Sequence, residues 1–207
     1  RSIWITLCQE AGIWNNPCGS IQLFTNSIEL ELAESFYEQE KNVRNLRLLT
    51  KEDCFAEVSS ANKNIYVGLG TATNKEHVKG GKKAGAQFII SPHTDEEVIR
   101  KTKKLELISI PGVASPTDVG NAIKFGADAL KFFPAKSLGT DYLKAVREPF
   151  PNQIWMATGG ISIDSAGDWI KAGCTAVGLG SPLTSGGVSE IRNRVAGFQS
   201  AIAEAKK

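Results

Sequence analysis

The sequence predicts a single-domain (β/α)8 barrel, and three observations lead to this prediction. Short apolar runs alternate with polar-faced helical stretches from residue 65 to the C-terminus, which is typical of parallel α/β folds. Three helical stretches end in a lysine followed two residues later by a glycine, at Gly85, Gly126 and Gly173, and such a glycine closes a helix in the left-handed conformation. The length of 207 residues suits one α/β barrel.

Buried parallel strands read as continuous apolar runs rather than as alternating patterns. Six such runs predict strands at residues 65–68, 87–90, 107–110, 127–133, 153–157 and 175–179. Two more are expected upstream, at residues 19–25 and 43–49, and eight parallel units close naturally into a barrel. The alternative is an open doubly wound sheet, which usually has fewer strands and a Gly-rich nucleotide loop after the first one.

Helix starts are expected between these strands. Residues 94–97 have the pattern of a capping box, and residues 116–118, 140–142 and 162–164 are further helix entries. Upstream, a helix from residue 26 would place Ile28, Leu32 and Phe36 on one face. Residues 1–18 fit no such unit, so we expect a capping segment over 1–18 and the barrel over 19–207.

The charges nearly cancel, since 24 Lys and Arg against 22 Asp and Glu leave a net charge of +2. This is too small for the broad basic field that binds nucleic acid or anionic membranes, so we expect neither partner. No run approaches the ~18 apolar residues of a membrane span, and the start does not read as a secretory signal. The four cysteines and two histidines lack CxxC or metal-ligand spacing, so we expect no disulfides, no metal site and a cytoplasmic location.

Lys131 is the first candidate for chemistry. The period-two alternation of a strand sends Lys131 and Phe133 to one face, and one face of a barrel strand points inward. Keeping a free lysine neutral at pH 7 costs about 4.6 kcal/mol, and burial among apolar side chains removes much of that cost. Because a neutral amine attacks ketones, a buried Lys131 indicates Schiff-base chemistry. The alternative is a lysine that extends its ammonium into solvent at the strand end.

Glycine-rich turns follow the last two predicted strands, at residues 158–162 and 178–182. Backbone N–H groups in such turns bind phosphate in many barrels, so together they predict a phosphorylated substrate, although each alone equally fits a tight turn. The loop at residues 68–71 ends in Thr71. Its hydroxyl is a candidate ligand for a carboxylate or carbonyl oxygen, or else the cap of a turn.

Five motifs run in order along the chain: Val67-Gly68-Leu69-Gly70-Thr71, Gly85-Ala86-Gln87-Phe88 with Ser91-Pro92, Ile110-Pro111-Gly112-Val113, Leu130-Lys131-Phe132-Phe133-Pro134-Ala135 and Thr158-Gly159-Gly160-Ile161. In order and spacing they resemble the 2-keto-3-deoxy-6-phosphogluconate (KDPG) aldolases and the related 4-hydroxy-2-oxoglutarate (KHG) aldolases. The resemblance implies a class I aldolase, an aldehyde-lyase of carbohydrate metabolism on an (α/β)8 barrel, usually a homotrimer. Such an enzyme cleaves KDPG to pyruvate and glyceraldehyde 3-phosphate without a metal or cofactor, with KHG as a further substrate.

The same resemblance assigns roles to individual residues. Lys131 matches the Schiff-base lysine, and Thr71 matches the residue that holds the pyruvyl carboxylate. The pocket lining and the contact near the reacting carbons match Pro92, Phe133 and Thr158. The phosphate ligands match Gly159, Gly160, Gly180 and Ser181.

One departure from the family pattern concerns the proton shuttle. The family carries an acid/base glutamate on its second strand, in a pattern resembling Glu-Val-Thr-Leu-Arg-Thr whose arginine binds the substrate carboxylate. Here that position falls on Asn45 or Arg47, and Arg47 remains a substrate-binding candidate. General acid–base assistance contributes roughly 10²- to 10⁴-fold, so a chain without it would retain slow chemistry through a bound water or a carboxylate such as Glu52.

Three functions therefore stay open at this point. The first is a pyruvate-forming aldolase that acts through an imine on Lys131. The second is a catalytically weak or inactive barrel that binds a phosphorylated keto acid as a sensor or assembly partner, because the glutamate is not found. The third is another phosphate-binding barrel enzyme, an isomerase or synthase, that uses paired carboxylates.

Overall fold

The computed structural model describes residues 66–180 and 188–207, and every structural statement below concerns this part of the chain. The strands expected at residues 19–25 and 43–49, the helix expected from residue 26 and the capping segment expected at residues 1–18 lie outside the described residues.

Strands and helices alternate along the described chain, as expected from the sequence. In order they are β1 (Gly68–Leu69), α3 (Lys75–Lys83), β2 (Phe88–Ile90), α4 (Glu96–Lys104), β3 (Ile108–Ile110), β4 (Gly112–Val113), α5 (Pro116–Phe125), β5 (Leu130–Phe132), α6 (Ala135–Leu138), α7 (Thr140–Arg147), β6 (Trp155–Thr158), α8 (Ile163–Lys171), β7 (Ala176–Gly178) and α10 (Val188–Ala205). Each of the six strand predictions within this region meets an observed strand, with ends shifted by a few residues.

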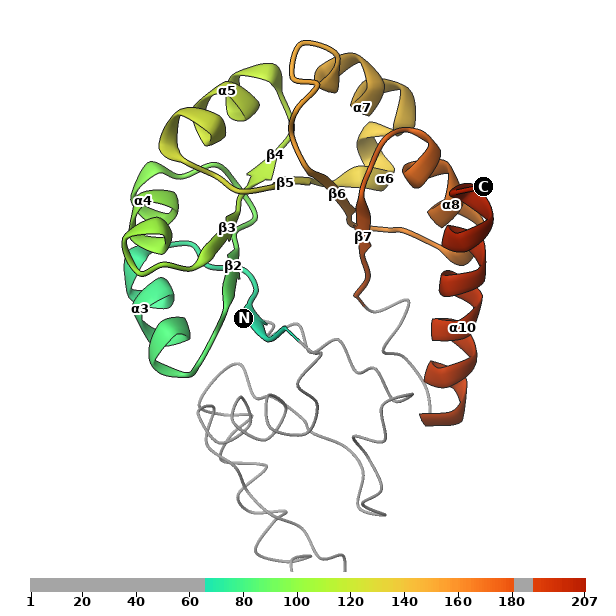
Figure 1. The fold of residues 1–207 in the computed structure, drawn as a ribbon, viewed down its shortest axis with the longest axis horizontal. Helices are drawn as coiled ribbons and strands as arrows, with labels where there is room; N and C mark the ends of the chain where they lie inside the picture. The colour runs from blue at the N-terminus through green and yellow to red at the C-terminus, as the bar shows by residue number, and fades with distance from the viewer. Residues whose placement is uncertain (1–65, 181–187) are drawn as a thin grey trace, which may run out of the picture.

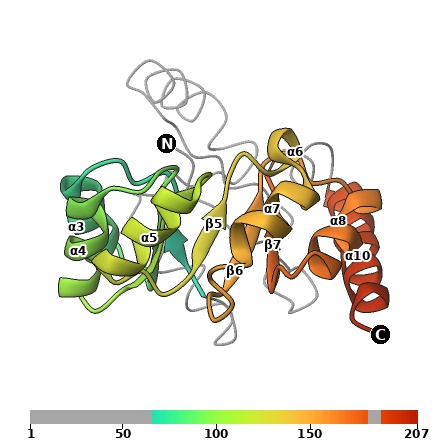
Figure 2. The ribbon, with the colours of Figure 1, turned by 90° about the horizontal axis from the view of Figure 1, so that it is seen from above.

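The strands form two parallel sheets, in the orders β1-β2-β3 and β4-β5-β6-β7. They lie along the inner side of an arc, and the helices cover its outer side (Figure 1). Seen from above, α6 lies beyond the end of β5, at one rim of the wall (Figure 2). An arc of parallel strands enclosed by helices is the wall of an α/β barrel rather than a flat open sheet.

Pro111 stands between the expected strand β3 and a short strand, β4, that the sequence did not predict. β3 pairs with β2 and β4 pairs with β5, and Pro111 separates them. A proline has no N–H to give to a sheet ladder, but its carbonyl still accepts from the Lys131 N–H at 2.8 Å. The segment around Pro111 therefore passes from one sheet to the next without leaving the wall.

Apolar side chains pack between the strands and the helices in two clusters. The first lies under α3 and α4 and includes Val67, Val78, Ile89 and Val98, each at most 3% exposed. The second lies under the later helices, with Leu130, Phe132, Leu143, Trp155 and Trp169 among its members. α10 packs against α8 and adds Phe198 to the second cluster. The outward faces of the strands are thus fixed by burial, which leaves their alternate residues facing the barrel interior.

The glycines that follow the lysine-rich helix ends adopt the expected conformation. Gly85, Gly126 and Gly173 have φ values of 92°, 97° and 103°, so the prediction that they close helices in the left-handed region is confirmed. The helix entries at residues 116–118, 140–142 and 162–164 are confirmed by α5, α7 and α8.

The capping box expected at residues 94–97 is wrong in its details. Asp95 is the N-cap of α4, and its side chain accepts from the Val98 N–H at 2.8 Å. The Thr94 hydroxyl instead donates to the Gly112 carbonyl at 2.9 Å. Aspartate is at least as good an N-cap as threonine, and the adjacent strand offers Thr94 an acceptor that the sequence pattern does not reveal.

Gly112 is the point where the loop after β2 meets the next sheet. A Cβ atom at this position would collide with the backbone carbonyl group of Pro92, so only glycine allows the two backbones to approach so closely. Gly112 is also paired with Lys131 in the β4–β5 register. This glycine therefore fixes the Pro92 loop next to the strand that carries Lys131.

Among the described residues, no helix is long and apolar enough to cross a membrane.

We predict that Gly112→Ala lowers the free energy of unfolding by about 1 to 3 kcal/mol, because the added methyl group overpacks a backbone contact. Urea denaturation measures the effect. The matched control is Gly120→Ala within α5, where an added Cβ meets nothing within 4 Å; it should stabilise the protein by up to about 1 kcal/mol. Equal effects of the two substitutions would contradict the close contact.

Candidate active site

Lys131 lies on β5 with its two neighbours held outward. Leu130 and Phe132 are fully buried in the second apolar cluster, and the alternation of a strand therefore turns Lys131 to the interior face. The Lys131 side chain is only 5% exposed. The alternative of a lysine that reaches into solvent is thus wrong, because the strand leaves its amine inside the barrel wall.

The surroundings of Lys131 favour its neutral form. Burial lowers the pKa of the Lys131 amine below its usual value, because an ammonium loses its hydration there. The amine nitrogen lies 4.3 Å from the centroid of the Phe133 ring. An aromatic face attracts a cation by about 0.5 to 2 kcal/mol, so the ring moderates the desolvation but does not reverse it. Among the described residues, Lys131 has no carboxylate partner.

Phe133 joins Lys131 to the glycine turn after β6. A Cβ at Gly159 would lie 3.2 Å from the Phe133 ring, so the ring packs directly on this glycine. Gly159 and Gly160 have φ values of 101° and 75°. Two successive left-handed residues suit glycine, and such a turn presents backbone N–H groups to one side, where an anion can bind.

Thr158 has a buried hydroxyl without a partner. The residue is 7% exposed, and its Oγ1 makes no hydrogen bond in the described structure. Gly178, its partner in the β6–β7 register, has no Cβ, and one placed there would lie 2.5 Å from this oxygen. A buried hydroxyl without a partner costs about 1 to 3 kcal/mol, and an expected ligand is a physical reason for a protein to retain one.

Thr71 has a backbone conformation that is unusual for a β-branched residue. Its φ is 58°, which is a genuine outlier for a β-branched residue. Strain of this kind, of order 1 to 3 kcal/mol, clusters at ligand sites. The residue follows β1, and the next amide, the Ala72 N–H, donates to the Ile90 carbonyl at 3.0 Å. The structure thus places Thr71 beside Ile90, the last residue of β2, which directly precedes the Ser91-Pro92 motif.

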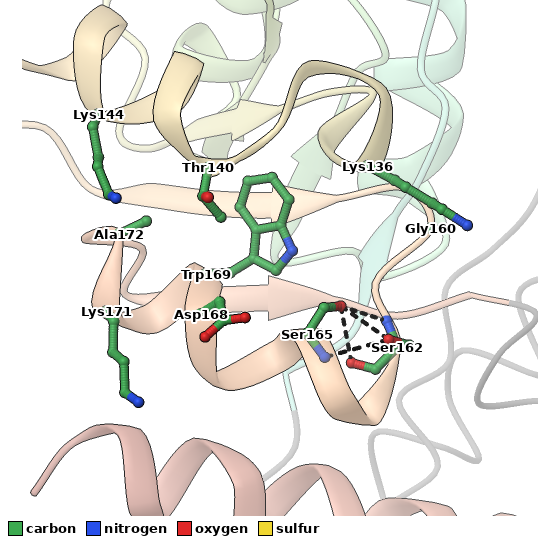
Figure 3. Close-up of a pocket in the computed structure, with 10 residues that line it drawn as sticks. All are labelled: Lys136, Thr140, Lys144, Gly160, Ser162, Ser165, Asp168, Trp169, Lys171 and Ala172. Atoms are coloured by element: carbon green, nitrogen blue, oxygen red, sulfur yellow. Dashed lines mark hydrogen bonds between the residues drawn. The ribbon is translucent and has the colours of Figure 1, made fainter.

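A cavity of about 520 Å³ lies outside the barrel wall, between α6, α7 and α8. Gly160 and Lys136 stand at one side of it, and Lys144 and Lys171 at the other (Figure 3). At the start of α8 the Ser162 and Ser165 hydroxyls bond to each other, and each accepts from the backbone N–H of the other serine. The cavity does not include Lys131, so it adjoins the glycine turn rather than the amine.

The structure brings together most of the candidates from the sequence. Lys131, Phe133, Thr158, Gly159 and Gly160 form one continuous set through the contacts described above. The Pro92 carbonyl group lies against Gly112, which is paired with Lys131. Gly180 follows β7, the strand that pairs with β6. Arg47, Asn45, Glu52 and Ser181 lie outside the described residues.

Two further residues lie at this site in ways that the sequence did not predict. Gly178 was expected in the glycine-rich turn after the last strand, but its packing against the Thr158 hydroxyl was not expected. Lys136 was not noticed, although it lies only five residues after Lys131, at the carboxyl end of the same strand. That position at a strand end was the available signal.

The described residues hold a buried strand lysine, an adjacent aromatic ring and a glycine turn at the next strand end. The sequence family described as "Aldolase: KDPG and KHG aldolase" matches residues 27–195. The chain belongs to this family. As a member of the KDPG and KHG aldolase family it is an aldehyde-lyase with the (β/α)8 barrel fold, and the expected fold class is confirmed.

Individual relatives support the family assignment. The 2-dehydro-3-deoxy-6-phosphogalactonate aldolase of Escherichia coli (strain K12) is 35% identical over 153 residues, which are 72% of this chain and 75% of that protein. A structure of the 4-hydroxy-2-oxoglutarate/2-dehydro-3-deoxyphosphogluconate aldolase from TTHB1 has 29% identity and a TM-score of 0.66, over 87% of this chain and 90% of that one.

A third relative carries chemical information. It is the KDPG aldolase from Legionella pneumophila, solved with pyruvate captured at low pH as a covalent carbinolamine intermediate. It shares 27% identity and a TM-score of 0.62, and the match covers 73% of this chain and 74% of that one. Members of the KDPG and KHG aldolase family act on keto acids, many of them phosphorylated, and the relatives differ in which sugar acid their names give.

We predict that Lys131→Met stabilises the protein at neutral pH by more than about 1 kcal/mol, because a methionine removes a buried, unpaired polar group. The folded-state pKa of Lys131 lies below its unfolded value, so the unfolded chain binds more protons and the wild type gains stability as pH rises through the range between the two values. The advantage of the variant should therefore shrink toward about pH 10. Urea denaturation at several pH values measures this, with the exposed Lys124→Met as control; a pH-independent difference would contradict a buried amine.

We predict that Thr158→Val raises the free energy of unfolding by about 1 to 2 kcal/mol and lowers turnover about 10-fold or more, because no described group pairs with this buried hydroxyl and a bound substrate would be its partner. Thermal denaturation and an aldol-cleavage assay measure the two effects. Thr102→Val is the matched control, since the buried Thr102 hydroxyl donates to the Val98 carbonyl at 2.7 Å. It should lower stability by about 1 kcal/mol, and stability changes of the same sign would count against the unpaired state of Thr158.

Proposed function

We propose that this protein is a class I aldolase that cleaves a 2-keto-3-deoxy-6-phospho sugar acid, with KDPG as the expected form, to pyruvate and glyceraldehyde 3-phosphate. The observation that carries the proposal is the buried Lys131 amine on the inner face of β5, 5% exposed and 4.3 Å from the Phe133 ring. A desolvated lysine beside an anion-binding turn combines the nucleophile with a place for the far end of a phosphorylated substrate.

The first step is the attack of the neutral Lys131 amine on the C2 carbonyl carbon. A C–N bond forms, the carbonyl oxygen takes a proton to give a carbinolamine, and loss of water then leaves an imine. The lowered pKa of Lys131 increases the fraction of amine that is able to attack. Once the imine is protonated it is a cation, and the Phe133 ring that faces the nitrogen stabilises this charge.

The protonated imine then accepts the electron pair of the C3–C4 bond. Loss of the proton from the C4 hydroxyl breaks this bond, releases glyceraldehyde 3-phosphate and leaves an enamine on Lys131. Protonation at C3 and hydrolysis by one water release pyruvate and restore the amine. Thr158 is the described residue best suited to bond the reacting hydroxyl, because its own hydroxyl is buried and free of other partners.

Contacts at the two ends of the substrate complete the proposal. Thr71, held in a strained conformation after β1, would bind the carboxylate, with Pro92 against the pyruvyl part. Gly159 and Gly160, with Gly180 and Ser181 from the next loop, would bind the phosphate through backbone N–H groups. Ser181 and the substrate-binding candidate Arg47 belong to the proposal from the sequence alone.

Two relatives bear on the details. The Legionella pneumophila KDPG aldolase holds pyruvate as a covalent carbinolamine, which is the type of intermediate proposed here for Lys131. The 35% identical relative from Escherichia coli is named for the galactonate form of the sugar acid. The galacto epimer is therefore the direct competitor of KDPG in any substrate assay, and KHG is a third substrate to compare.

A second candidate function rests on the missing glutamate at residues 43–50. A chain that forms the imine but moves protons slowly would bind phosphorylated keto acids with little turnover. The groups that decide this, Asn45, Arg47 and Glu52, lie outside the described residues. Turnover, rather than imine formation, separates the two candidates.

The assembly and the compartment are also part of the proposal. A homotrimer follows from the resemblance to the family. A cytoplasmic location agrees with Cys174, the free cysteine among the described residues. Burial raises the pKa of the Cys174 thiol to about 11, so this thiol is protonated and unreactive at neutral pH.

We predict that incubation with pyruvate and borohydride attaches a reduced pyruvate imine to Lys131 and to no other lysine, because the lowered pKa of Lys131 gives it a larger neutral fraction than an exposed lysine has, and the neutral amine is the form that condenses with a ketone. Peptide mass spectrometry locates the adduct. Lys131→Met should remove both the adduct and all cleavage of KDPG, whereas Lys124→Met should keep both. An unmodified Lys131 in the wild type would overturn the proposed function.

A steady-state cleavage assay with KDPG, its galacto epimer and KHG then measures turnover. Ordinary turnover rules out the second candidate. An adduct without turnover supports it and contradicts an active aldolase.

A further inference from the structure

The Lys136 side chain follows the glycine turn after β6 along its outer side. Its stem lies against Gly160, since a Cβ placed at that glycine would come within 2.7 Å of the Lys136 Cβ and 2.8 Å of its Cδ. In Figure 3 the Lys136 side chain runs past Gly160 and its ammonium lies beyond the turn, away from Lys144 and Lys171. The absence of a side chain at Gly160 is therefore what allows this cation to lie along the turn.

The backbone ties Lys136 to the same turn. The Lys136 N–H donates to the Gly159 carbonyl at 3.0 Å, which joins the start of α6 to the loop between β6 and α8. This bond occupies the Gly159 carbonyl, whereas the N–H groups of Gly159 and Gly160 donate to no backbone carbonyl within the described part of the chain. The N–H groups of the turn and the Lys136 side chain therefore lie together, at the end of the barrel where β5 and β6 finish.

Lys136 is one of several exposed lysines of the described chain, with Lys124 and Lys171, that form no ion pair with a described carboxylate, and of these it is the one whose stem lies against Gly160. Lys75, Lys79, Lys103 and Lys144 each form an ion pair with a carboxylate, at distances between 2.5 and 3.6 Å. Lys136 has no carboxylate within this range among the described residues. Its positive charge is thus not neutralised by the protein beside the turn that exposes N–H groups.

We propose that Lys136 is a specificity-determining residue that adds a cation to the phosphate held at the Gly159–Gly160 turn, so that this chain selects phosphorylated over unphosphorylated keto acids. Backbone N–H groups bind phosphate and carboxylate alike, whereas a full positive charge favours the dianion. The inference rests on the proposed function for the identity of the substrate. The contacts of Lys136 with the turn do not depend on it.

The test compares Lys136→Met with wild type on KDPG and on the same sugar acid without its phosphate. We expect KM for KDPG to rise about 10-fold, as for the loss of one charge-assisted contact at a partly exposed site, with kcat and the activity on the unphosphorylated acid nearly unchanged. Lys136→Arg should restore most of the loss. A KM for KDPG that stays at the wild-type value in Lys136→Met would overturn the proposal.

Lys144→Met is the matched control, because Lys144 lines the same cavity but is paired with Asp141 at 3.0 Å. It should leave KM for KDPG unchanged. If Lys144→Met weakens KDPG as much as Lys136→Met does, the anion binds in the cavity between the helices and the assignment to the glycine turn is wrong.

Inorganic phosphate separates this inference from the proposed function. Calorimetric titration of wild type and of Lys136→Met with inorganic phosphate needs no turnover and no imine. A weaker affinity in the variant supports the role of Lys136 even if Lys131 fails to trap pyruvate. Equal affinities overturn it even if the trapping succeeds.

Discussion

The site depends on the opposite directions taken by neighbouring side chains of β5. Leu130 and Phe132 are fully buried under the helices, and neither can turn inward without opening the largest apolar cluster of the described chain. Because successive side chains of a strand point to opposite faces, Lys131 between them points to the interior face. The amine is therefore held in a poorly solvated place by packing that lies entirely outside the site. Because the core holds the amine in place, no polar partner that would keep it protonated is needed.

The remaining parts of the site are arranged around this strand by close backbone contacts. Gly112 brings the loop after β2 to one side of Lys131, and Gly159 receives the Phe133 ring on the other. Each contact exists because a glycine lacks a Cβ. The result is a site whose walls are set by backbone geometry, within which a few side chains, such as those of Thr158 and Thr71, stay unsatisfied or strained in the free protein.

Much of the fold could be predicted from the sequence because its signals are local. Apolar runs located the strands, and the lysine–glycine pattern located helix ends whose glycines do take positive φ. The short strand β4 after Pro111 and the donation from Thr94 to Gly112 could not be predicted, because both depend on which strand lies next to which.

For the site, alternation along β5 was enough to predict an inward lysine. The strain at Thr71, the unpaired hydroxyl of Thr158 and the position of Lys136 on Gly160 arise only when distant segments meet. No pattern within one segment reports them, since each is a relation between two strand ends.

The contact between Gly112 and the Pro92 carbonyl bears on how such an enzyme can diversify. Two backbones meet there with no side chain between them, and one of them is in register with Lys131. A side chain can be exchanged while the backbone around it stays in place. Where two backbones are in direct contact, a shift of one requires a shift of the other. Evolution toward new substrates should therefore proceed more easily through the loops after β5 and β6 than through the loop after β2, where any change of shape would also displace the Lys131 amine.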